Sequence, residues 1–432
     1  MKDIKCSARE AALQTLIRCE RDGSYSNIES NSQIKKHSLE GKERALFTAL
    51  VRGVIERIIT LDYHIASVSS RPLSELDTTL RMILRIGAYQ LLYFDRIPDH
   101  AAVYESVTLA KKYVNAGSGS YVNAVLRELS RKAVSGTLSF PDDEMQALSV
   151  TYSVPEGLIK MWQEQYGNNQ TIEILKALSK PHGITLHVNT LKTTADTLCR
   201  SLDSLGITYS VCPGENALIL NAGTPFEKVE NLAAQGMFFV QDLSSQSAAA
   251  MLKAEPGDCV IDTCICPGGK SFALALAMKN QGSIYGFDLH KNKFSLVKET
   301  QSRLGIDIIS LEERDARNPD PALFGKADKV LCDVPCSGLG IIAKKPEIRY
   351  RDINTLERFS SLSLEILNAS KNYCKAGGYM LFSTCTLNKA ENDDVLDSFL
   401  RQNTDFSLIE KKTFFPTGSS DGFFAALVKC TK

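Results

Sequence analysis

Two cysteines in this sequence each follow a short apolar run that predicts a buried strand. Cys336 comes three residues after Asp333, and Pro335 should end the first strand because proline cannot donate a hydrogen bond to a sheet. Cys385 follows the second run, Gly378–Thr384, in the same way. Free cysteines are often inert core residues. Open α/β sheets bind ligands at the carboxyl ends of their strands, so we expect these three polar residues to share one site.

A glycine-containing segment, residues 264–270, lies between an earlier predicted strand and a predicted helix. Backbone N–H groups at the start of such a helix can approach a ligand closely. A phosphate-binding P-loop would need glycine at Cys264, and the dinucleotide fingerprint Gly-x-Gly-x-x-Gly is absent. S-adenosylmethionine (SAM) is the nucleoside-bearing cofactor that remains.

Acidic residues at the ends of the following strands support that cofactor. Asp288 ends the second predicted strand, where a carboxylate can accept both ribose hydroxyls, and Asp315 is placed to meet the adenine edge. The residues expected to bind the cofactor are Cys264, Ile265, Cys266, Pro267, Gly268, Gly269, Lys270, Asp288, Asp315 and Asp333.

A thiolate beside a methyl donor is suited to methylation of cytosine at C5, which is a poor nucleophile. Addition of a cysteine to C6 makes the ring an enamine that can take up the methyl group. The sulfur must be ionised, and the base must leave its stack to reach the pocket. We expect Cys385, Cys336, Asp333 and Lys270 to be catalytic, and their spacing leaves open which cysteine attacks.

The elements that must position these residues fall into three predicted parts. Residues 1–135 show apolar residues at helical spacing and predict a helical bundle, with Asp99 capping one helix and Gly117–Ser120 breaking the chain before the last. Residues 136–230 predict a small α+β connector. From residue 231 to 432 strands and helices alternate, which predicts a Rossmann-like class I methyltransferase domain. Its expected parallel strands are 259–263, 283–287, 306–309, 329–332 and 379–383, and two more strands, 406–411 and 423–429, close the chain.

Several motifs resemble known families. The first part resembles the NusB-like RNA-binding domain in three stretches: Arg85–Gln90, Asp95–Ala102 and Tyr121–Arg127. The last part resembles bacterial cytosine-C5 RNA methyltransferases in Pro267–Lys270, Asp333–Gly340, Ser383–Thr386 and Glu391-Asn392. With Gln241–Gln246 and Asp421–Phe424 added, the whole chain resembles the RsmB (Sun/Fmu) type of 16S rRNA methyltransferase.

This resemblance implies SAM-dependent methylation of cytosine 967 of 16S rRNA through a cysteine–C6 adduct, with Cys385 attacking and Cys336 releasing the adduct. It also implies RNA contacts by a basic stretch that includes Lys344, Lys345 and Arg349, which would otherwise be a solvated charged loop. The chain departs from the family pattern at three positions: Ile265 and Cys266 replace two alanines, and His187 replaces an arginine.

The bulk composition is that of an ordinary soluble protein, with 44% hydrophobic residues, 23% charged residues and a net charge of zero. There is no long apolar run and no signal-peptide pattern, so we expect a cytoplasmic protein with reduced cysteines, no membrane contact and no metal. We expect a monomer whose partner is 16S rRNA. The alternatives are a tRNA cytosine-C5 methyltransferase and a non-catalytic NusB-like RNA-binding factor, and the paired cysteine motifs argue against the second.

Overall fold

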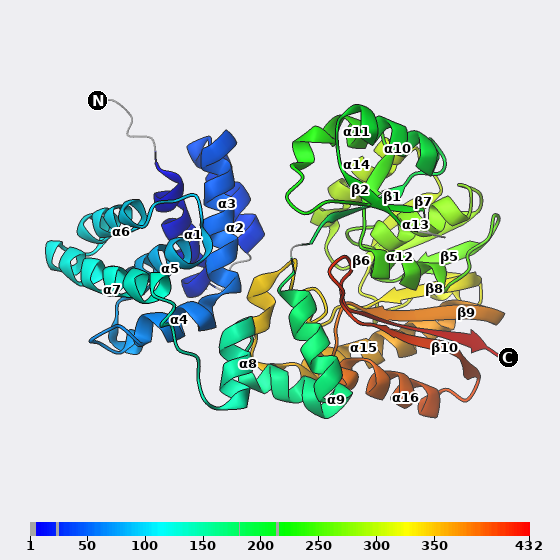
Figure 1. The fold of residues 1–432 in the computed structure, drawn as a ribbon. Helices are drawn as coiled ribbons and strands as arrows, with labels where there is room; N and C mark the ends of the chain where they lie inside the picture. Colours follow the sequence, from blue (N-terminus) through cyan, green and yellow to red (C-terminus); the bar gives the residue numbers. More distant parts are fainter. Residues whose placement is uncertain (1–5, 23–25, 181, 213–215) are drawn as a thin grey trace. The chain divides into compact units, whose positions relative to one another are not determined.

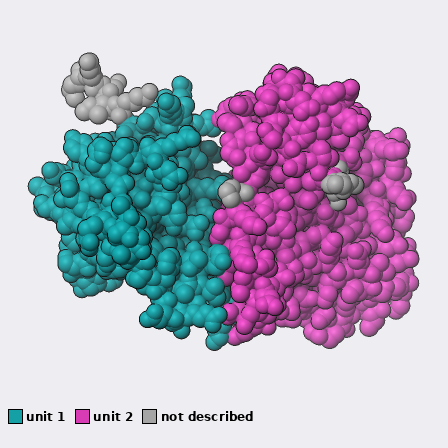
Figure 2. Space-filling model, in the orientation of Figure 1, with its two compact units in different colours: residues 1–161, 345–351 teal, residues 162–344, 352–432 magenta. Residues whose placement is uncertain are grey.

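The computed structural model describes residues 6–22, 26–180, 182–212 and 216–432 (Figure 1). The chain forms two compact units, which Figure 2 colours separately. Unit 1 contains residues 1–161 and 345–351, and unit 2 contains residues 162–344 and 352–432. The finer division at residues 135 and 230 stays a prediction. No described helix combines the length and the apolar character needed to cross a bilayer.

Unit 1 is built from helices, as the apolar spacing predicts. Within α5 (Thr78–Tyr93), Leu80, Ile83 and Leu84 all point into one buried core. The other helices are α1 Ala8–Asp22, α2 Ser26–His37, α3 Gly41–Glu56, α4 Ile58–Ala66, α6 Asp99–Tyr113, α7 Ala116–Val134, α8 Glu144–Tyr152 and the start of α9 Glu156–Leu178.

Two local predictions in unit 1 are wrong. Gly117–Ser120 does not break the chain but lies inside α7, because the Asn115 side chain caps this helix by accepting a hydrogen bond from the Ser118 N–H at 2.9 Å. Gly119 also has a packing role, since a Cβ there would lie 2.8 Å from the Lys111 side chain. Asp99 does not cap α6: Pro98 occupies the N-cap, and the Asp99 carboxylate accepts a hydrogen bond from Ser130.

The segment 345–351 packs into unit 1 through two side chains. Arg349 is 2% exposed and donates hydrogen bonds to the carbonyls of Glu56 at 2.8 Å and Ser153 at 3.0 Å. The Tyr350 hydroxyl donates to the Ile55 carbonyl at 2.9 Å. These bonds join the ends of α3 and α8 to the segment.

Unit 2 begins with a small antiparallel sheet in the order β2-β3-β1-β4. Its strands are β1 Ile184–Val188, β2 Tyr209–Val211, β3 Ala217–Leu220 and β4 Phe238–Val240, accompanied by α10 Ala195–Ser204 and α11 Glu230–Ala234. The rest of α9 also lies in this unit, and its Trp162 indole donates to the Leu387 carbonyl at 3.0 Å.

The second sheet of unit 2 has seven strands in the order β10-β11-β9-β8-β5-β6-β7. The strands are β5 Cys259–Asp262, β6 Ser283–Asp288, β7 Ile309–Glu313, β8 Ala327–Asp333, β9 Cys374–Thr384, β10 Phe406–Phe414 and β11 Phe423–Cys430. Strands β5 to β9 pair in parallel and β11 runs antiparallel to both of its neighbours. The predicted Rossmann-like methyltransferase fold is confirmed.

Helices cover both faces of this sheet (Figure 1). On β8, Leu331 packs into a core with α12 (Leu243–Ala250), α13 (Gly269–Ala277) and α14 (Phe294–Leu304). Its neighbours Val330 and Cys332 pack into the opposite core with α15 (Glu357–Ser370) and α16 (Asp393–Gln402). This alternation follows from the two-residue period of a strand buried on both faces.

The third parallel strand begins later than predicted, at Ile309 instead of Ile306. Gly305 adopts a left-handed conformation (φ 74°) at the end of α14, and the Ile306 N–H then bonds back to the Gln301 carbonyl at 3.0 Å. Ile306 is therefore an apolar residue of a helix-ending motif.

Candidate active site

Cys336 and Cys385 lie side by side at the carboxyl edge of the large sheet. Their Sγ atoms are 3.2 Å apart, and both residues are partly exposed. They meet because β8 and β9 are parallel neighbours, so the loops after these strands leave the same edge. The Gly340 N–H donates to the Cys385 carbonyl at 2.9 Å and holds the two loops together.

An ion pair lies at the same edge. The Lys270 Nζ is 2.7 Å from the Asp333 Oδ2 and 4.8 Å from the centre of the Phe423 ring, and Lys270 is 7% exposed. The Ser383 hydroxyl donates to the other oxygen of Asp333 at 2.8 Å. These contacts fix the orientation of the Asp333 carboxylate.

The glycine turn is shaped by a glycine and a buried acid. Gly268 has φ 102°, a conformation that L side chains rarely adopt, and α13 begins at the next residue. Asp262 accepts hydrogen bonds from the Ser271 hydroxyl at 2.5 Å and the Cys264 N–H at 3.1 Å. Burial raises the pKa of Asp262 to about 7. The N–H groups of residues 269–271 start the helix and have no acceptor within it.

The two predicted acids that follow differ in their surroundings. Asp288 ends β6, is 9% exposed and accepts a hydrogen bond from the His290 N–H at 2.9 Å. Asp315 follows β7, and its carboxylate accepts hydrogen bonds from the Arg317 backbone and guanidinium at 2.6–3.1 Å. The guanidinium lowers the pKa of Asp315. Asp288 is thus a buried carboxylate near the turn, and Asp315 is engaged by a neighbouring cation.

Two of the departures from the family pattern are accommodated by packing. Ile265 is 3% exposed, and its side chain lies over Gly286 on β6. The His187 Nδ1–H donates to the amide oxygen of Gln241 at 2.8 Å, and the imidazole stacks on the Phe239 ring at 4.7 Å. Burial lowers the pKa of His187 to about 4, so it is a neutral packing residue.

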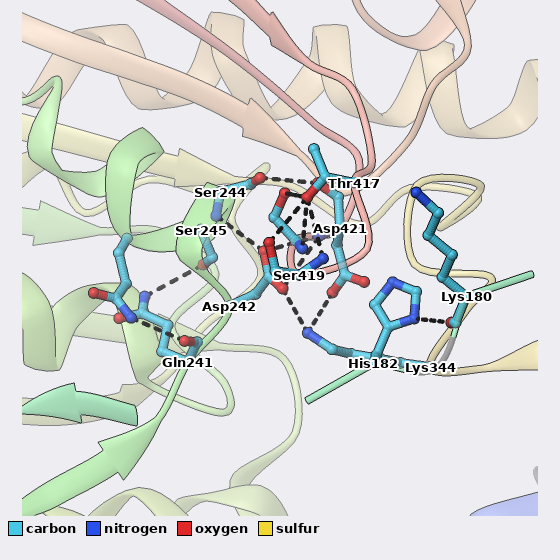
Figure 3. Close-up of polar contacts among 12 residues, drawn as sticks. Lys180, His182, Gln241, Asp242, Ser244, Ser245, Lys344, Thr417, Ser419 and Asp421 are labelled. Carbon is cyan, nitrogen blue, oxygen red and sulfur yellow. Dashed lines mark hydrogen bonds and ion pairs between the residues drawn. The ribbon is translucent and has the colours of Figure 1, made fainter. Parts of the chain in front are cut away.

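Lys344 lies between two buried carboxylates of unit 2 (Figure 3). Its Nζ is 2.6 Å from Asp242 and 2.7 Å from Asp421. Asp242 caps α12, and the Ser244 hydroxyl of this helix donates to the Asp421 carbonyl at 2.9 Å. The Gly422 N–H then donates to the Gly340 carbonyl at 2.8 Å. We call Lys344, Asp242 and Asp421 the acid–lysine clamp; it joins three segments that are far apart in sequence.

The basic residues predicted to bind RNA therefore have different environments. Lys344 is in the clamp, and the Arg349 guanidinium is buried in unit 1, where it donates to backbone carbonyls. Lys345 is exposed. An RNA contact by this stretch stays a prediction, and Lys345 is its best-placed member.

Comparison with known proteins decides the family. Three family models match: the NusB family over residues 6–131, a ferredoxin-like domain of RsmF/B-like methyltransferases over 154–227, and 16S rRNA methyltransferase RsmB/F over 249–428. A probable ribosomal RNA small subunit methyltransferase B from Bacillus subtilis (strain 168) is 35% identical, covering 93% of this chain and 90% of its own. The chain belongs to the RsmB/F family of 16S rRNA methyltransferases.

Two further matches extend over most of this RsmB/F-family methyltransferase. A probable ribosomal RNA small subunit methyltransferase B from Synechocystis sp. is 34% identical, covering 93% of this chain and 90% of its own. The crystal structure of PH0851 superposes with a TM-score of 0.81 at 26% identity, covering 97% of this chain and 98% of that one. The predicted resemblance to this family, including its NusB-like part, is confirmed.

One acid that contacts the glycine turn, Asp262, is not among the predicted site residues. Asp262 ends β5 as Asp333 ends β8, so the rule applied to one would have found the other. The clamp joins two of the family-like motifs, Gln241–Gln246 and Asp421–Phe424, and no spacing in the sequence predicts their contact.

Proposed function

We propose that this RsmB/F-family methyltransferase transfers the methyl group of SAM to C5 of a cytosine in 16S rRNA through a covalent cysteine adduct. The observation that carries the proposal is the 3.2 Å separation of the Cys336 and Cys385 sulfurs at strand ends beside the Lys270–Asp333 ion pair. Two thiols in contact, next to a carboxylate held by an ammonium, are the groups that addition to C6 and later elimination require.

The residues around the glycine turn fit SAM. The amide groups at the start of α13 suit the amino acid end, and the buried Asp288 carboxylate suits the ribose hydroxyls. When bound, SAM supplies an electrophilic methyl group. Ile265, the larger residue of the turn, packs over Gly286 and is buried within the protein.

In the proposed reaction, the Cys385 sulfur adds to C6 and its lone pair forms the new C–S bond. Asp333 would bind the polar edge of the base while N3 takes up a proton from solvent. The resulting enamine carbon C5 would accept the methyl group that SAM supplies, leaving the cofactor as the neutral thioether. The C5 proton then passes to a solvent base, the C6–S bond breaks with its electron pair returning to the Cys385 sulfur, and N3 gives up its proton as the ring regains aromaticity. Cys336 acts in this release. The assignment of attack to Cys385 comes from the family resemblance.

Single-cysteine variants test the proposal on unmethylated 16S rRNA. Cys385→Ala should abolish methylation and form no adduct, whereas Cys336→Ala should accumulate an RNA–protein adduct that survives denaturing electrophoresis. Bisulfite sequencing of the product identifies the cytosine, and a tRNA transcript assayed in parallel tests the alternative acceptor. Adduct accumulation in Cys385→Ala instead would reverse the assignment, and its absence from both variants, together with retained methylation, would refute covalent catalysis.

A further inference from the structure

Glu391 is a fully buried acid that neither the cofactor turn nor the predicted chemistry uses. It is 0% exposed and lies in a short 3-10 turn, Lys389–Glu391, between β9 and α16. Its carboxylate accepts hydrogen bonds from the Ser337 N–H at 2.7 Å, the Ser337 hydroxyl at 2.6 Å and the Asn388 amide at 3.0 Å. A buried carboxylate is costly unless such donors satisfy it, and these donors suit its ionised form.

The donors connect Glu391 to the residues that follow the two cysteines. Ser337 follows Cys336, and its hydroxyl also bonds to the hydroxyl of Thr386 at 2.7 Å, the residue that follows Cys385. Each cysteine is therefore followed by a hydroxyl residue, and the hydrogen bond between the two hydroxyls joins the two loops.

The next residue, Asn392, holds the other loop. Its amide donates to the Thr386 carbonyl at 3.0 Å and accepts from the Thr384 hydroxyl at 2.6 Å, so it fixes the residues on both sides of Cys385. The acidic Glu391 thus binds the loop that carries Cys336, and the neutral Asn392 binds the loop that carries Cys385.

This difference in charge gives the Cys336 sulfur a carboxylate in its surroundings. A negative charge close to a thiol disfavours its ionisation. The contact with Cys385, burial and the Glu391 carboxylate together raise the pKa of Cys336 well above its usual range. The Lys270–Asp333 ion pair places two further charges at this edge of the sheet. Asp333 lies three residues before Cys336 in the sequence.

We propose that Glu391 is a positioning residue of the methyl transfer, one that fixes Cys336 beside Cys385 and places the proton of the ionised cysteine pair on Cys336. When the two thiols lose one proton to solvent, the remaining proton stays on the Cys336 sulfur. The Cys385 sulfur then carries the electron pair that forms the bond to C6. This inference rests on the proposed function and gives a structural reason for the direction of attack.

Thiol alkylation tests proton placement without RNA or cofactor. The rate of iodoacetamide labelling of Cys336 is followed by mass spectrometry between pH 6 and 10 in Cys385→Ala and in Cys385→Ala/Glu391→Gln. Removing the charge should shift the labelling profile by about one pH unit to lower pH, which is about tenfold faster labelling at a fixed pH below the midpoint. An unshifted profile in a folded double variant overturns the proposal.

Ser337→Ala in the same Cys385→Ala background is the matched control. It removes the hydroxyl bridge but keeps both the carboxylate and the backbone donor of residue 337, so the profile should stay in place. A second comparison keeps Glu391 and so does not depend on whether the Glu391→Gln variant folds. In it, Cys336 of the Cys385→Ala variant should titrate at higher pH than Cys385 of the Cys336→Ala variant. The opposite order would also refute the proposal.

Kinetics of the enzyme with both cysteines complete the test. Glu391→Gln should lower kcat about tenfold or more at neutral pH with little change in the KM for RNA. Raising the pH should recover part of kcat, because the misplaced proton then leaves Cys385, whereas a purely structural loss would not recover. Methylation of cytosine C5 with an unshifted alkylation profile would defeat this inference alone. The expected profile without any cytosine methylation would defeat the proposed function instead.

Discussion

Gly286 on β6 lies directly beneath the Ile265 side chain of the glycine turn. A Cβ built at residue 286 would be 2.3 Å from Cδ1 of Ile265, a distance that real Cβ atoms do not show. Because residue 286 has no side chain, the Ile265 side chain can occupy the space above it.

This relationship predicts coupled effects on stability. Gly286→Ala should lower the free energy of unfolding by about 1–3 kcal/mol through overpacking, and Ile265→Ala by about 2–4 kcal/mol through a cavity. The double variant should lose less than the sum, because the added methyl group enters the space that the isoleucine leaves. Urea unfolding followed by the fluorescence of Trp162 measures all three, and strict additivity would contradict the packing described.

The acid–lysine clamp predicts that removing its cation destabilises unit 2. Lys344→Met should lower the free energy of unfolding by on the order of 2 kcal/mol, since two buried carboxylates then share no cation; partial exposure of Lys344 moderates the loss. Adding Asp421→Asn to Lys344→Met should recover part of this stability. Lys344→Arg, which keeps the charge, is the control. If the double variant is no more stable than Lys344→Met, the charges are not coupled.

The same clamp predicts a pH dependence. Burial, together with the charge of Asp242, raises the pKa of Asp421 to about 7, so the native state binds this proton more tightly than the unfolded state. The associated stability is complete below the usual range of an aspartate and is lost as the pH rises through about 7. Between pH 5 and 8, wild type should therefore lose stability relative to Asp421→Asn, by on the order of 1–2 kcal/mol. Asp262 is present in both proteins and cancels from the comparison. A difference independent of pH would show that Asp421 does not titrate in this interval.

The edge of the sheet where the site lies could be predicted from the sequence, because the ends of its strands are set by local residue preferences. Pro335 can follow a strand but not continue it, and β8 ends at Asp333 as expected. Parallel strands bring their carboxyl ends together, so the two cysteine motifs meet although they are 49 residues apart. The helical spacing of unit 1 was predictable for a similar reason.

What the sequence could not predict depends on contacts between distant segments. The partners of Lys344 and Arg349 are set by tertiary packing, so both resembled exposed basic residues of a loop. Gly117–Ser120 has the composition of a loop, but the Asn115 cap and the packing of Gly119 against α6 make it helical. Local propensity is overridden wherever tertiary contacts are stronger.

The burial of Arg349 predicts that it contributes to stability and not to RNA affinity. Arg349→Met should lower the free energy of unfolding by about 1–3 kcal/mol, since the carbonyls of Glu56 and Ser153 lose a charged donor. The slope of log affinity for 16S rRNA against log salt concentration should not change. Lys345→Met is the matched variant: a phosphate contact by Lys345 would reduce that slope by about 0.7–0.9. A smaller salt-dependence slope for Arg349→Met would instead indicate that Arg349 contacts RNA phosphate.

The Lys270–Asp333 ion pair predicts a catalytic effect that can be separated from binding. Lys270→Met should lower kcat by about 10²–10³-fold, because the Asp333 carboxylate loses the ammonium 2.7 Å away and no longer binds the base in a fixed orientation. The methionine keeps the apolar stem that is buried against Phe423, so the fold should be preserved. Phe423→Leu, which removes the ring but keeps the ion pair, should cost less than tenfold in kcat. Single-turnover methylation of 16S rRNA with saturating SAM measures both variants, and equal losses in the two would indicate that packing around Lys270 matters more than its charge.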